Sequence, residues 1–157
     1  MKPLALLVPL ALLAGCSGGS KATGGVSKAD YIKKAEVICT KAVADQKALK
    51  TPTTPDLIPA YVAGVIAIAD AATTGLAALE APKADKKALE AKVIEPLQGQ
   101  LAVAHDYYDQ IVAATKNKDQ KALVKLLGNP PTDAKADLRW MKSYGFTQCV
   151  DAADTSN

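Results

Sequence analysis

Apolar residues recur every three or four positions along most of the chain beyond residue 26, which is the spacing of helices that bury one face. Prolines and glycines fall between these apolar stretches, where the chain must turn. Every segment of this part is helical in this interpretation, so the predicted fold is all-α, a helical bundle. It comprises four main helices and a short one, over residues 27–50, 56–79, 85–115, 132–143 and, for the short helix, 118–127.

The first predicted helix begins with a capping pattern and carries a cysteine on its apolar side. Ser27 followed by Asp30 three residues later is typical of a capping box. At about 100° per residue, Cys39 falls among the apolar residues of this helix. A buried, structural cysteine is therefore favoured over an exposed reactive thiol.

The second and third helices each contain an irregularity. Leu57–Ala69 is a nearly continuous run of thirteen apolar or small residues. This run is too short to span a bilayer, and it predicts a helix buried in the core. Pro96 lies well inside the third helix, where we expect a kink or a break because proline lacks the N–H that a helix interior uses.

The first sixteen residues have the pattern of a secretion signal. Lys2 supplies a positive charge, and Leu4–Leu13 forms an apolar segment of the length that such signals need. The sequence Leu13-Ala-Gly-Cys16 that follows resembles the bacterial lipobox, which implies transfer of a diacylglyceryl group to Cys16 and cleavage before it. Two or more acyl chains give stable membrane anchoring. We therefore expect a signal peptide over residues 1–15 and a lipid anchor on Cys16.

The predicted mature chain divides into a short linker and one domain. Residues 16–26 are rich in glycine and serine, which is typical of a flexible tether. Residues 27–157 then form the helical bundle domain, which is long enough to build a core of its own.

The number and distribution of charged residues limit the classes of partner that the chain is expected to bind. The full sequence has 19 basic and 16 acidic residues, a balance of +3, and loss of Lys2 with the signal leaves +2. The charges are interspersed, and no basic patch with interleaved aromatic residues is present, so nucleic-acid binding is not expected. The membrane is the expected partner, through the lipid on Cys16.

Two cysteines, Cys39 and Cys149, remain once Cys16 carries the lipid. An even pair in an exported chain favours a disulfide, and only one pairing is possible. Two buried thiols, or a metal or redox role, are the alternatives, although no Cys-x-x-Cys motif supports redox chemistry. The bond would close nearly the whole domain.

Two short motifs bracket the predicted bundle. They are Ala35-Glu-Val-Ile-Cys39 in the first helix and Tyr144-Gly-Phe-Thr-Gln-Cys149 in the tail. In this layout the mature chain resembles small Ala-rich, two-cysteine helical lipoproteins of high-GC Gram-positive bacteria. The resemblance implies a disulfide-closed bundle, and it carries over no functional residue because such proteins are mostly of unknown function.

Candidate catalytic and metal-binding residues are few. His105 is the only histidine, and its neighbour Asp106 points about 100° away on the helix, so it cannot easily orient the imidazole. No nucleophile elbow, phosphate-binding glycine loop or zinc-protease motif is present. Carboxylates such as Glu90 with Glu95, or Asp106 with Asp109, are more typical of solvated helix faces than of metal sites. We therefore expect no catalytic residue, no metal ion and no cofactor.

One aromatic group is a candidate binding site. Tyr107 and Tyr108 in the third helix, together with Trp140, Met141 and Tyr144 near the end of the chain, could line a crevice between helices. Ordinary packing of these rings is the alternative.

These patterns predict a membrane-anchored, extracytoplasmic lipoprotein without enzymatic activity. Its expected role is a binding or interaction module of the cell envelope, with an envelope protein as partner. The alternative is a carrier of a small apolar ligand, a lipid or a metabolite, held in an apolar pocket between helices.

Overall fold

The computed structural model describes residues 25–131 and 136–154, and within these ranges the chain forms helices and turns without a strand. The predicted signal peptide, Cys16 and nearly all of the linker lie outside the described residues. The all-α prediction is confirmed. The first helices are α1 (Lys28–Ala48), a 3-10 turn η1 (Pro55–Leu57) and α2 (Ile58–Ala77), and α5 (Gln120–Gly128) follows further along the chain.

The predicted third helix is continuous but contains an irregular turn next to Pro96. It consists of α3 (Lys86–Leu89), the π-helical turn η2 (Glu90–Ile94) and α4 (Glu95–Lys116). In a regular helix the N–H of residue 96 would bond to the carbonyl of Lys92, and proline has no N–H to donate. The backbone N–H of Asp137 donates to that carbonyl instead, at 3.2 Å. The irregularity expected at Pro96 is thus a π-helical turn rather than a break.

The end of the chain differs from its prediction. The last predicted helix, over 132–143, is the shorter α6 (Leu138–Tyr144), whose start is capped by the Asp137 carboxylate accepting from the Trp140 N–H at 2.9 Å. Gly145, with φ of 118°, ends it in the left-handed region. A further helix, α7 (Gln148–Asp154), takes the place of the expected tail.

The start of α5 also needs correction. Asn117 ends α4, and α5 begins at Gln120 rather than at residue 118 because its cap is Asp119, whose carboxylate accepts from the Ala122 N–H at 2.9 Å. Lys118 between them has a positive φ of 56°, which lets the chain reverse within the three residues that separate α4 from α5.

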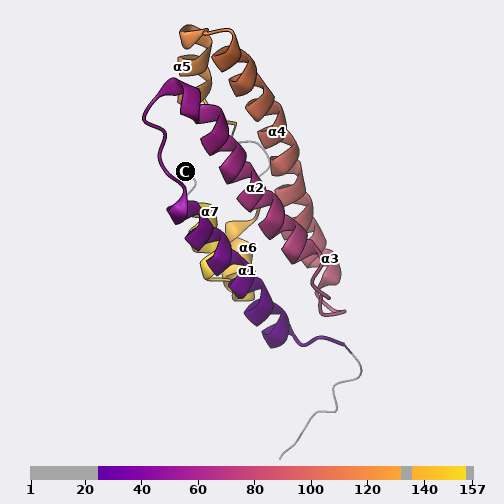
Figure 1. Ribbon diagram of the computed structural model, residues 1–157. Coiled ribbons are helices and arrows are strands. Elements are labelled where there is room, and N and C mark those ends of the chain that lie inside the picture. The colour runs from indigo at the N-terminus through magenta and orange to yellow at the C-terminus, as the bar shows by residue number, and fades with distance from the viewer. Residues whose placement is uncertain (1–24, 132–135, 155–157) are drawn as a thin grey trace, which may run out of the picture.

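The helices form two apolar clusters at opposite ends of a bundle in which α2 and α4 lie side by side (Figure 1). The larger cluster joins α1, α6 and α7 to the lower ends of α2 and η2 and contains Tyr31, Leu89, Val93 and Phe146. The smaller cluster joins α4 and α5 around Ile111, Ala114 and Leu123. The Cys39–Cys149 disulfide links α1 to α7 with 4.9 Å between the Cα atoms, so the predicted disulfide is confirmed.

The apolar helix α2 is not the buried core helix that its sequence predicts. Pro55–Ala77 is the one stretch among the described residues that is long and apolar enough to cross a bilayer by length and composition. Only 11% of its most apolar window is buried. The other helices cover two sides of α2 and leave a third open, and the open side carries mostly alanines, such as Ala60, Ala67 and Ala71. Alanine offers little apolar surface, so its exposure costs little free energy.

Candidate functional site

An apolar cavity of about 230 Å³ lies between the helices. Its walls come from α1, α2, α4, α6 and α7 and from Ala136, which lies two residues before α6. The lining residues are Cys39, Ala42, Val43, Gln46, Val65, Ile68, Ala69, Ala72, Thr73, Leu76, Leu97, Gln100, Ala136, Met141, Cys149 and Ala152.

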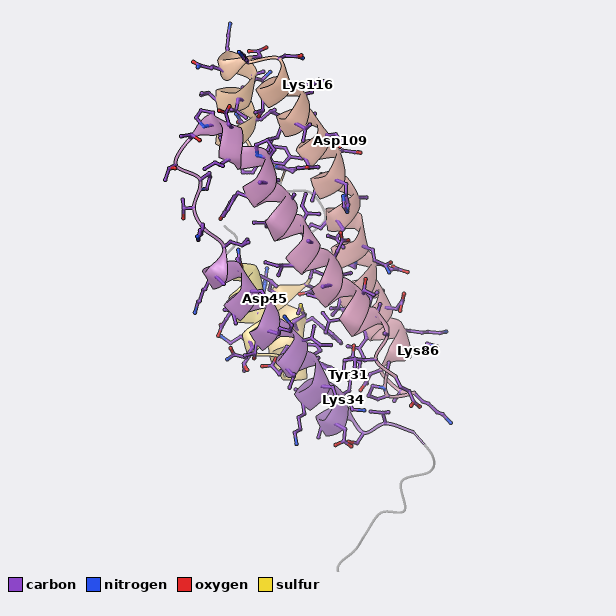
Figure 2. All side chains as sticks on the ribbon, in the orientation of Figure 1. Tyr31, Lys34, Asp45, Lys86, Asp109 and Lys116 are labelled. Atoms are coloured by element: carbon purple, nitrogen blue, oxygen red, sulfur yellow. A yellow bond between two sulfur atoms is a disulfide. The ribbon has the colours of Figure 1, made fainter. Side chains whose placement is uncertain are left out.

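Among the described residues, the lining carries neither a charged nor an aromatic side chain. Its polar side chains are Gln46, Thr73 and Gln100, and the rest are aliphatic or contain sulfur. Charged side chains such as Lys86, Asp109 and Lys116 lie on the outer surface and point away from the bundle (Figure 2). A site of this composition binds through apolar burial, with a few polar groups to orient a ligand.

Small side chains create the space. Ala42 on α1, Ala72 on α2 and Ala152 on α7 face the cavity from three helices, where leucine or isoleucine would fill it. Tightly packed interiors gain dispersion contacts that an empty apolar cavity forgoes. A ligand with apolar surface would recover those contacts.

One side of the cavity is open. Ala69 on α2 lines it and is exposed to solvent, and Gln46 and Val65 are half-buried. The opposite wall is closed by the core, where Cys39, Leu76, Met141 and Cys149 are 3–5% exposed. A ligand can therefore enter from the surface and end against the disulfide.

Glu36 of α1 holds the start of α7. Its carboxylate accepts from the backbone N–H of Thr147 at 2.8 Å, the Thr147 hydroxyl at 2.8 Å and the N–H of Gln148 at 2.7 Å. Partial burial by itself raises the pKa of this carboxyl, but the hydrogen bonds from Gln148, Thr147 and Cys149 together lower it below the usual value. Glu36 thus caps a helix that is distant in sequence.

Contacts between Lys92 and Asp137 position the part of the cavity wall that Ala136 and Met141 form. Lys92 Nζ lies 3.3 Å from the Asp137 carboxylate, beside the backbone bond from Asp137 to the Lys92 carbonyl. The hydrogen bond from the Trp140 N–H and the contact with Lys92 lower the pKa of the Asp137 carboxyl. These contacts fix the start of α6 against η2, and Ala136 and Met141 on either side of Asp137 line the cavity.

The structure does not bring Tyr107 and Tyr108 together with Trp140, so the crevice expected between them is wrong. Tyr107 packs in the smaller cluster, and its hydroxyl donates to the Leu126 carbonyl at 3.0 Å; burial raises its pKa. Trp140 packs against the larger cluster and stacks on Tyr144 with 4.8 Å between ring centroids. Tyr108 is half-buried, and none of the three lines the cavity.

Tyr107 and Trp140 pack against the two apolar clusters at opposite ends of the bundle. Their separation is set by tertiary structure, which the periodicity of a single helix does not encode.

His105 has a partner that the sequence did not reveal. Its Nε2 lies 3.1 Å from the carboxylate of Asp70 on α2, with 54% and 46% of the two side chains exposed. Asp106, the neighbour considered from the sequence, is exposed and takes no part in this pair. In the described ranges no group of three or more His, Cys, Asp or Glu side chains is placed to hold a metal ion.

Comparison of the chain with protein-family models, with curated proteins and with solved structures finds no match. The residues and contacts of the chain itself are therefore the basis for a function.

Proposed function

We propose that this protein is a lipid-anchored, extracytoplasmic binding protein that holds a small apolar ligand, without catalysing a reaction. The observation that carries the proposal is the cavity between the helices, which opens to the surface beside Ala69 and whose described lining residues include no charged side chain. Apolar pockets with a few convergent polar groups are the usual form of small-molecule sites.

The location rests on the first residues of the chain. The charged start, the apolar segment Leu4–Leu13 and the lipobox-like Leu13–Cys16 support export and a diacylglyceryl anchor. The Cys39–Cys149 disulfide is consistent with an oxidising compartment. A membrane anchor would keep the cavity close to a source of apolar ligands.

An interaction module for an envelope protein is the second candidate, and the open side of α2 is the observation that favours it. This side is apolar and uncovered by other helices. A photo-crosslinking residue at Ala67, which is exposed and does not line the cavity, would join such a partner to the chain in whole cells. Absence of a crosslinked protein there would remove this candidate.

Native mass spectrometry of the full chain, gently extracted from its own membrane, tests the ligand-binding function. We expect a bound small molecule on the wild type and its loss in Ala72→Leu, which fills the cavity from α2. Ala71→Leu is the matched control because Ala71 is adjacent in sequence, exposed and outside the cavity. Equal occupancy in all three proteins, or no bound molecule on the wild type, would contradict the proposal.

A further inference from the structure

We infer that the ligand is a single flexible aliphatic chain with an uncharged polar head group, the chemistry of a monoacylglycerol. The inference rests on the proposed function and adds the class of ligand. It is drawn from the residue types that line the cavity and from the types that are excluded from it.

The lining favours an aliphatic chain over a planar ring. Rigid aromatic ligands are commonly held by aromatic side chains, which offer stacking and edge contacts. The rings of Tyr31, Tyr107, Trp140, Tyr144 and Phe146 all belong to, or pack against, the two core clusters, and none lines the cavity. Its walls are instead leucine, isoleucine, valine, alanine and Met141, whose flexible thioether adapts to a mobile chain.

The lining also excludes a charged head group from the interior. Burial of a carboxylate or phosphate without a cationic partner costs several kcal/mol. Among the residues that the structure describes, 25–131 and 136–154, no lysine, arginine or histidine lines the cavity. The carboxamides of Gln46 and Gln100 provide N–H donors and carbonyl acceptors, which suit a hydroxyl or an ester.

The size of the cavity limits how much of the chain it encloses. An apolar cavity of about 150 Å³ holds a molecule such as benzene. The present cavity, at about 230 Å³, has room for a segment of one acyl chain but not for a two-chain lipid. The head group then lies just inside the opening, beside the half-buried Gln46, where it is still partly withdrawn from water.

Titration of the full chain with monoacylglycerols of increasing chain length tests the inference, with complexes counted by native mass spectrometry. Each added methylene that enters the cavity should tighten binding about fourfold until the cavity is full, after which the affinity should level off. A fatty acid of matched length should bind more weakly when ionised than when protonated, and a sterol more weakly than the best monoacylglycerol.

Two variants separate the cavity from the surface and from misfolding. Ala72→Leu on α2 and Ala152→Leu on α7 fill the cavity from two different helices, and both should shorten the chain length at which the affinity levels off. Ala71→Leu should leave the series unchanged. If Ala72→Leu fails to fold, Ala152→Leu carries the test.

The outcomes distinguish the inference from the function beneath it. Tighter binding of the sterol or of the ionised fatty acid, with loss of that binding in Ala72→Leu, would overturn the ligand class and leave the apolar-ligand function standing. A second pair of results would overturn both the ligand class and the function. These are a wild type that carries no molecule from its own membrane, and a monoacylglycerol affinity that changes neither with chain length nor in the two cavity variants.

Discussion

At the scale of single residues, Gly145 is the position where the backbone conformation requires glycine. Its φ of 118° ends α6, and an added Cβ would lie 3.0 Å from Ile32 Cδ1. Gly145→Ala should therefore destabilise the domain by about 1–2 kcal/mol. Gly128→Ala is the control, because a Cβ there meets nothing within 4 Å and should stabilise the end of α5 slightly. Urea unfolding of the three proteins measures both, and equal stability of Gly145→Ala and wild type would refute the role of Gly145.

Glu36 is the residue whose charge matters most for the position of α7. Because its pKa is lower in the folded chain than the usual 4.5, its ionised form stabilises the fold above that value. This stabilisation should disappear as the pH falls through the folded-state pKa.

The variant Glu36→Gln tests this linkage. It should cost about 1 kcal/mol of unfolding free energy at pH 7 and less in acid, where the wild type has lost the same contribution. Glu80→Gln, at an exposed position, serves as the control. A difference between wild type and Glu36→Gln that stays constant from neutral to acidic pH would show that the charge is not involved.

At the scale of elements, the helices with long repeating patterns could be predicted, and the short ones set by distant contacts could not. The apolar residues around Tyr31 and around Leu89 recur at helical spacing, and this spacing predicts the two helices because each helix buries a continuous face. The seven residues of α7 are too few for a clear period, and the cap of α7 is Glu36, more than a hundred residues earlier. The last helix is predicted to begin at residue 132 but begins at Leu138 for the same reason. The start of α6 is fixed by Asp137 and by the distant Lys92.

The sequence predicts the type of the candidate site, an apolar pocket between helices, but not the residues that line it. Such a pocket follows from an Ala-rich bundle, whereas the residues that line it depend on the docking of α7. This docking is not encoded in local periodicity. Cys39 and Cys149 are the exceptions, because cysteine pairing in an exported chain is a constraint that the sequence states directly.

The disulfide connects the element scale to the cavity. It spans 110 residues and should stabilise the domain by roughly 4–5 kcal/mol in the chain-entropy model. Reduction should lower the melting temperature and weaken apolar-ligand binding, because α7 forms one wall. A calorimetric scan with and without reductant measures the first effect. An unchanged transition in a chain whose two thiols are shown to be free would contradict it.

At the scale of the whole molecule, two apolar clusters hold the bundle together. The bundle contains a cavity where α1, α2, α4 and α7 do not pack tightly against one another. The ties around this space are specific: the disulfide, the Glu36 cap and the bonds of Asp137 to Lys92. A space with fixed walls and small side chains is suited to holding a ligand. Anchoring at a membrane, as proposed, would place that space beside a supply of acyl chains.

The most direct test of this account is an NMR measurement at Met141. The chain has two methionines, and Met1 belongs to the predicted signal, so a ¹³C-methyl-methionine label on the mature chain reports on Met141 alone, inside the cavity. On addition of a monoacylglycerol, the Met141 methyl resonance should shift and show nuclear Overhauser contacts to acyl-chain protons, and Ala72→Leu should abolish both. A Met141 signal that stays unchanged while the ligand is bound would contradict the assignment of this cavity as the binding site.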